Sequence, residues 1–173
     1  MLDDQVEALY GLSANDDRLN TDRVAIRGWS FGGYLAALAL LRRPDVFHAA
    51  VAGAPVTDWH LYDTHYTERY LGHPDSHPNN YTRSGLCDVG SWASPSDGVP
   101  NRPLLIVHGL ADDNVVVAHT LALSRVLLEN GRPHQVLPLS GVTHMTPQEE
   151  VAKNMLRVQL AFLQEALGMK VSI

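Results

Sequence analysis

The most constraining feature of this 173-residue sequence is the pentapeptide Gly-Trp-Ser-Phe-Gly at residues 28–32. It follows a short apolar run, residues 23–28, and precedes a longer apolar segment, residues 30–43, that stops at Pro44. The short run is typical of a buried strand and the longer one of a buried helix. A G-x-S-x-G sequence at such a junction predicts a sharp turn that lifts the hydroxyl of Ser30 above a sheet edge, with a glycine on each side because a Cβ there would clash.

Strands and helices alternate along the rest of the chain. Apolar runs at residues 48–54, 103–108 and 135–139 predict three further strands, and residues 119–130 predict a helix between the last two. This alternation indicates an α/β fold, a parallel sheet with helices on both faces. In such a sheet the loops that leave the carboxyl ends of the strands converge on one edge, the edge that presents the serine.

The last helix has the clearest boundary signals. We expect Thr146 to be its N-cap, Pro147 to occupy the first helical position and Glu149 to complete a capping box. Its expected apolar face consists of six residues: Val151, Met155, Leu156, Leu160, Leu163 and Leu167.

Composition excludes several classes of protein. Acidic residues outnumber basic ones by 19 to 13, which gives a net charge of -6 and argues against nucleic acid as a partner. No apolar stretch approaches the roughly 20 residues that a membrane-spanning helix needs. The single cysteine, Cys87, supports neither an internal disulfide nor a metal site. This cysteine usage and an acidic N-terminus without signal-peptide features favour a cytoplasmic location.

The stretch from residue 58 to residue 102 interrupts the alternation. It opens with Trp59, Tyr62, Tyr66 and Tyr70, whose spacings of three, four and four predict that the rings share one face of a helix. Aromatic residues at this spacing are compatible with core packing or with a binding pocket, and the pattern alone leaves both open.

A serine hydroxyl needs a base and a carboxylate to act as a nucleophile. The third predicted strand is followed by His-Gly-Leu-Ala-Asp-Asp-Asn at residues 108–114, and the fourth is followed by His144. Both loops fall at the edge that presents Ser30, so Asp112 or Asp113 would orient His144, which would take the serine proton. Spacing does not choose between the two aspartates.

These motifs carry a resemblance to a known family. Residues 28–34, residues 108–115 and His144 resemble the catalytic domain of the prolyl oligopeptidase family of serine peptidases. The run Trp-x-x-Tyr-Asp-x-x-Tyr-Thr-Glu-Arg-Tyr at residues 59–70 is similar to the dipeptidyl peptidase IV branch. The resemblance implies an α/β-hydrolase fold and a peptidase that releases N-terminal X-Pro or X-Ala dipeptides without a cofactor or a metal.

The resemblance also implies roles for individual residues. Ser30 is the implied nucleophile, Asp112 the acid of the triad, being the first of the aspartate pair, and His144 the base. The backbone N–H of Phe31 is the implied oxyanion donor. The implied substrate-binding residues are Val56, Trp59, Tyr62, Tyr66 and Val115 around a proline ring, and Asn114 on a substrate carbonyl.

The chain departs from the family pattern ahead of the strand-to-helix turn at residues 28–32, here called the elbow. The family places several strands and a β-propeller ahead of the elbow, and neither is found in this sequence. We therefore expect residues 1–173 to be a partial catalytic domain, the C-terminal half of an α/β hydrolase. The strand at Val24 would then be an unpaired edge, which favours a homo-oligomer or association with a missing N-terminal propeller portion.

Two alternatives remain at this point. One is another peptidase of the same family, an acylaminoacyl peptidase or an oligopeptidase. The other is a truncated, catalytically silent domain that acts mainly through association.

Overall fold

The computed structural model describes residues 1–93, 98 and 100–169, and its centre is a parallel four-stranded sheet. The strands lie side by side in chain order: β1 (Ala25–Trp29), β2 (Ala49–Gly53), β3 (Leu104–Gly109) and β4 (Gln135–Leu139). All three pairings are parallel. The predicted α/β class is confirmed, and β1 is an edge strand of the described sheet.

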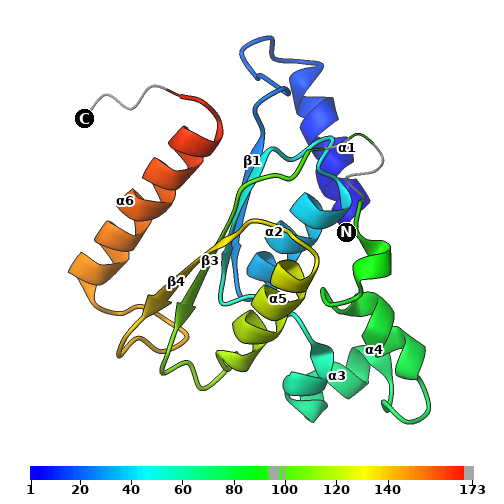
Figure 1. Cartoon of the computed structure of the whole chain (residues 1–173). Helices are drawn as coiled ribbons and strands as arrows, with labels where there is room; N and C mark the ends of the chain where they lie inside the picture. The colour runs from blue at the N-terminus through cyan, green and yellow to red at the C-terminus, as the bar shows by residue number, and fades with distance from the viewer. Residues whose placement is uncertain (94–97, 99, 170–173) are drawn as a thin grey trace.

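Helices cover both faces of this sheet. Figure 1 shows α1 (Leu2–Ser13), α2 (Phe31–Arg42) and α5 (Ala118–Glu129) on one face, and α6 (Glu149–Ala166) on the other. The connection from β2 to β3 forms four short helices beyond the carboxyl end of β2: η1 (Trp59–Leu61), α3 (Thr64–Leu71), α4 (Pro78–Ser84) and η2 (Val89–Ser91). In the described part of the chain, no helix is long and apolar enough to cross a membrane.

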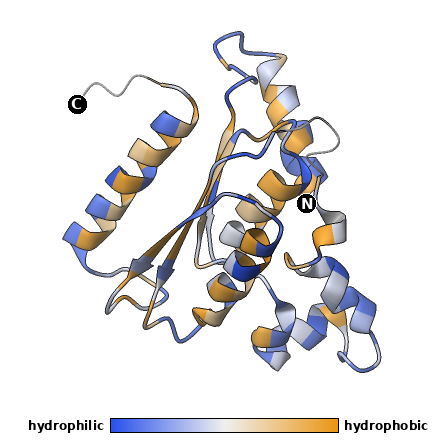
Figure 2. Cartoon of the chain, in the orientation of Figure 1, coloured by the Kyte–Doolittle hydropathy of each residue, from blue (hydrophilic) through white to orange (hydrophobic). Residues whose placement is uncertain are grey.

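The two faces of the sheet contribute to two separate cores because successive strand residues point in opposite directions. Ala50, Ala52 and Ile106 pack with the buried residues of α2 and α5 in the larger cluster. Val51 and Val107 pack on the opposite face, where they meet partly buried residues of α6. Figure 2 shows that α2 is almost wholly apolar, whereas α6 carries hydrophilic and hydrophobic residues together.

The predicted start of the last helix is wrong. The helix begins at Glu149, its N-cap is Gln148, and no side chain caps it. Thr146 lies before the helix, and its hydroxyl is buried without a hydrogen-bond partner. Gln148 has extended backbone, with φ -76° and ψ 111°, so the chain between Thr146 and Glu149 does not form the helical turn that a capping box needs.

The predicted apolar face of α6 is also only partly correct. Met155 and Leu163 do pack against the sheet, together with Phe162. Leu156 and Leu160 are instead 49% and 57% exposed. The helix carries apolar residues on more than one face, so periodicity alone does not select the face that meets the sheet.

Candidate active site

Ser30 lies in a strained turn between β1 and α2. Its backbone has φ 59° and ψ -120°, a region that residues with a Cβ rarely adopt. The Ser30 N–H donates to the carbonyl of Gly53 at 2.8 Å, which fixes the turn against the end of β2. The serine is the N-cap residue of α2, but its side chain makes no capping hydrogen bond. Its hydroxyl is therefore not used as a helix cap.

Only one of the two glycines of the pentapeptide has the role that the motif suggests. A Cβ on Gly28 would lie 2.1 Å from the carbonyl oxygen of Gly32, so this position requires glycine, as expected. A Cβ on Gly32 would meet nothing within 4 Å, which contradicts the expected clash. The second obligatory glycine is Gly33, where a Cβ would lie 2.2 Å from the carbonyl oxygen of Gly53. The doublet Gly32-Gly33 was the signal for it in the sequence.

Asp112 and His144 come together at the carboxyl edge of the sheet. Asp112 Oδ2 lies 2.8 Å from His144 Nδ1, and Asp112 Oδ1 accepts hydrogen bonds from the N–H groups of Asn114 and Val115 at 3.0 and 2.8 Å. The Asp112 side chain is buried, whereas Asp113 is exposed. The tertiary structure thus places the first aspartate of the pair, and not the second, on the histidine.

His108 supports this loop from the core. Its Nε2 lies 2.7 Å from the carbonyl oxygen of Val115, which can only accept, so Nε2 carries the proton. Nδ1 then accepts from the hydroxyl of Thr120 at 2.6 Å. Burial lowers the pKa of His108, which favours the neutral ring. His108 is therefore a packed, hydrogen-bonded residue that supports the loop.

Trp29 connects the elbow to the loop that carries His144. Its indole Nε1 donates to the carbonyl oxygen of His144 at 2.9 Å. The ring lies directly on Gly53, where a Cβ would be 1.9 Å from Trp29 Cε3. Between the described residues, no hydrogen bond joins the Ser30 hydroxyl to His144, and bonds of this kind often tighten only when substrate binds.

The aromatic residues do not share one continuous helix, contrary to the sequence prediction. Trp59 is in η1 and Tyr66 is in α3, and the chain is extended between them at Tyr62. Asp63 ends the continuity because its carboxylate accepts from the Tyr66 N–H at 2.9 Å and caps a new helix.

The rings nevertheless form one cluster, here called the aromatic wall: Trp59, Tyr62, Tyr66 and Tyr70. Trp59 and Tyr66 stack with centroids 6.3 Å apart, and Tyr66 lies 5.0 Å from Tyr70. Tyr62 meets both Trp59 and Tyr66 edge-on. Helical spacing in α3 brings Tyr66 and Tyr70 together, whereas ring packing joins them to Trp59 and Tyr62.

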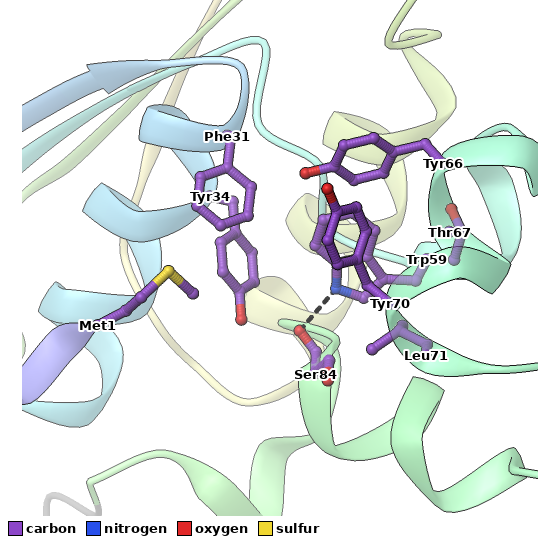
Figure 3. A pocket seen from close by; sticks show the side chains of 9 residues that line it. All are labelled: Met1, Phe31, Tyr34, Trp59, Tyr66, Thr67, Tyr70, Leu71 and Ser84. Carbon is purple, nitrogen blue, oxygen red and sulfur yellow. Dashed lines mark hydrogen bonds between the residues drawn. The ribbon is translucent and has the colours of Figure 1, made fainter.

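A cavity of about 350 Å³ lies between this wall and α2. Figure 3 shows Tyr66 and Tyr70 facing Phe31 and Tyr34 across it. The other lining residues are Met1, Trp59, Thr67, Leu71 and Ser84. The substrate-binding residues implied by the sequence did not include Tyr34 or Tyr70, although both line the cavity.

The remaining predicted pocket residues lie outside this cavity. Val56 and Val115 are buried, with exposed fractions of 3% and 0%, and belong to the larger core. Asn114 is exposed, and its Oδ1 accepts a hydrogen bond from the Tyr62 hydroxyl at 3.1 Å.

His119 packs against Tyr62 of the aromatic wall, with ring centroids 6.4 Å apart. Sequence reasoning did not single it out. The ring is fully buried, and its Nδ1 accepts from the N–H groups of Thr57 and Asp58 at 3.2 and 3.4 Å. Burial lowers the pKa of His119 to about 4, so the ring is neutral near pH 7. Within the described residues, no group of three or more His, Cys, Asp or Glu side chains is arranged to hold a metal ion.

A serine on a strained strand-to-helix turn, beside an aspartate-histidine pair at the carboxyl edge of a parallel sheet, defines the α/β-hydrolase class. Comparison with known proteins identifies the family. The model of the prolyl oligopeptidase family matches residues 1–170, and the chain belongs to that family.

Similar proteins include several dipeptidyl peptidases. Human dipeptidyl peptidase 8 is 42% identical over 173 residues, which is 99% of this chain and 19% of that protein. Dipeptidyl peptidase 4 of Sus scrofa is 36% identical over 140 residues, or 79% of this chain and 17% of that protein. The crystal structure of Porphyromonas gingivalis dipeptidyl peptidase 4 matches with a TM-score of 0.83 and 30% identity, covering 95% of this chain and 22% of that one. The chain thus spans about a fifth of the length of these relatives.

Proposed function

We propose that this chain, residues 1–173, is the partial catalytic domain of a serine peptidase that releases N-terminal X-Pro or X-Ala dipeptides through an acyl-enzyme. The observation that carries the proposal is the 2.8 Å contact between Asp112 and His144 at the sheet edge that also holds Ser30. The similarity to dipeptidyl peptidases supports the substrate class.

Ser30, His144 and Asp112 would share the chemistry as nucleophile, base and orienting acid. The Ser30 oxygen attacks the substrate carbonyl carbon while its proton moves to Nε2 of His144. Asp112 holds Nδ1–H, which fixes the tautomer and leaves Nε2 as the acceptor. The tetrahedral intermediate collapses, the C–N bond breaks, and the departing amine takes the proton from His144. Water then attacks the acyl-enzyme by the same route and releases the dipeptide.

The N-terminus of α2 would stabilise the oxyanion. The first N–H groups of a helix have no partner within the helix, and Phe31 is the first residue of α2. Its N–H follows Ser30 directly, which is the position of one donor in an α/β-hydrolase oxyanion hole. Such a donor typically contributes about 3 kcal/mol to stabilising the transition state.

The aromatic wall would bind the residue before the scissile bond. Trp59 and Tyr66 present flat apolar faces to the cavity, which suits a proline ring. Tyr62, Val56 and Val115 lie outside the lining of the cavity and would support this pocket from the larger core. Asn114 would bind a substrate carbonyl through its side-chain amide.

Labelling with a fluorophosphonate probe tests the triad. The probe reacts with an activated serine, so the purified protein should be labelled and Ser30→Ala should not. Equal labelling of the two proteins would overturn the mechanism. Absence of labelling from a folded sample would favour a catalytically silent domain that acts through association, for which the unpaired edge of β1 in the described sheet is the supporting observation.

Substrate profiling then tests the exopeptidase assignment. Cleavage of X-Pro and X-Ala substrates should be abolished when the substrate's amino group is acetylated. Cleavage that persists after acetylation would favour an acylaminoacyl peptidase or an oligopeptidase.

A further inference from the structure

One hydrogen bond connects the aromatic wall to the loop that carries the acid of the proposed triad. The Tyr62 hydroxyl donates to Oδ1 of Asn114 at 3.1 Å, across 52 residues of sequence. Asn114 is exposed and follows Asp112 by two positions. An exposed asparagine side chain without such a partner would rotate freely, so this bond selects one orientation of the amide.

The donor side of this bond is rigid. The Tyr62 ring lies edge-on to Trp59, Tyr66 and His119, with centroids 6.2, 5.5 and 6.4 Å away. Three rings from three segments therefore fix where the hydroxyl lies. Burial raises the pKa of Tyr62, so the hydroxyl keeps its proton and remains a donor near neutral pH.

The acceptor side is fixed at its backbone. The Asn114 N–H donates to Oδ1 of Asp112 at 3.0 Å, the same carboxylate whose other oxygen meets His144. An asparagine amide has an accepting oxygen and a nitrogen with two donor hydrogens. When the oxygen is held by Tyr62, the nitrogen must point to the opposite side of the amide, where it can donate to a carbonyl.

We propose that Tyr62 is a positioning residue that holds the Asn114 amide with its nitrogen free to donate to a substrate carbonyl. The proposal rests on the proposed peptidase function. It assigns Tyr62 a role beyond ring packing in the aromatic wall, because the hydroxyl acts through Asn114.

The first test compares Tyr62→Phe with the wild-type protein on an X-Pro substrate. The variant keeps the ring contacts and loses only the hydroxyl. Loss of one neutral hydrogen bond should raise KM about 3- to 10-fold with kcat nearly unchanged. Tyr81→Phe is the matched control, because it removes a hydroxyl that bonds to the Gly72 carbonyl, outside the site. An unchanged KM in Tyr62→Phe would overturn the proposal.

A double-mutant cycle separates positioning from direct substrate contact. If Tyr62 acts through Asn114, Tyr62→Phe should add nothing to the KM increase caused by Asn114→Ala. If the double variant instead raises KM by the product of the two separate increases, Tyr62 contacts the substrate independently, which contradicts the proposal.

A measurement without substrate distinguishes failure of this proposal from failure of the proposed function. In NMR, the side-chain amide of Asn114 should be ordered in the wild-type protein and in Tyr81→Phe, and disordered in Tyr62→Phe. Equal order in all three proteins would overturn the positioning role even if the protein is an active peptidase. An inactive protein that shows the expected loss of order would keep the positioning role and reject the peptidase function.

Discussion

The elbow around Ser30 and the aromatic wall border the same site but are built by different forces. At the elbow, backbone meets backbone: Gly28 faces the Gly32 carbonyl and Gly33 faces the Gly53 carbonyl, with no room for a Cβ. The wall is built by rings that pack 5.0 to 6.3 Å apart and are partly open to solvent. Tyr66 is 39% exposed and Tyr70 is 66% exposed.

The difference predicts how each region responds to substitution. A backbone contact leaves no side chain to rearrange, so a single methyl group forces the chain to move. Ring contacts can relax, so changes to the wall should give graded effects on binding. A substitution at the elbow should therefore either disrupt the turn or leave it unchanged. A substitution in the aromatic wall should change substrate binding by degrees.

Gly28→Ala should have the largest effect. Its methyl would lie 2.1 Å from the Gly32 oxygen, so the turn must open and Ser30 must move. We expect a loss of about 3 kcal/mol or more in the free energy of unfolding and loss of probe labelling. Urea unfolding and fluorophosphonate labelling measure the two effects. Normal labelling in this variant would contradict the all-or-none description of the elbow.

Protonation of His119, which packs against Tyr62 of the aromatic wall, should have the next largest effect. It should lower the free energy of unfolding in acid. Above pH 6.5, its ordinary pKa, the ring is neutral in both folded and unfolded chains; below it, the unfolded chain binds a proton that the folded ring does not bind until about pH 4. Stability is therefore fully present above pH 6.5 and is lost as the pH falls to 4, by about 3 kcal/mol.

The variant His119→Asn makes this prediction testable by urea unfolding at pH 7 and at about pH 4.5. Asparagine can accept the same backbone hydrogen bonds and does not titrate in this range. The variant should lose less stability with acid than the wild-type protein, whereas a change at the exposed His65 should leave the loss intact. A loss identical to that of the wild type would exclude His119 as its source.

Tyr66→Ala should have a graded effect on binding. The substitution removes an aromatic face that lines the cavity, and losing about 1 kcal/mol of apolar contact with the substrate should raise KM for an X-Pro substrate about five- to tenfold with the fold intact. Steady-state kinetics measures it, with Leu128→Ala, a 76% exposed position on α5, as the control. Complete loss of folding would mean that the wall is as intolerant as the elbow.

Gly32→Ala should have the smallest effect. The added methyl meets nothing within 4 Å, and alanine is favoured over glycine in a helix. The free energy of unfolding should rise by about 0.5 kcal/mol. A loss as large as that of Gly28→Ala would show that the two glycines of the pentapeptide are equivalent after all.

Much of the fold could be predicted because its signals are local. Apolar runs located all four strands, and β4 has the predicted bounds, Gln135–Leu139. The same reasoning failed at Thr146, because the backbone stays extended at Gln148 and the helix begins only at Glu149. It also failed along residues 59–70, where a cap at Asp63 begins a new helix within an otherwise helical spacing.

The sequence by itself determined the alternation of strands and helices, the parallel sheet and the strand-to-helix turn at Ser30, because periodicity and turn chemistry depend on neighbouring residues. Only the tertiary structure decided that Asp112, and not Asp113, meets His144, and that Gly33, and not Gly32, must lack a side chain. Tertiary structure also joined Tyr62 to Asn114. These outcomes depend on atoms from segments far apart in the chain, whose approach is set by how the strands and helices pack.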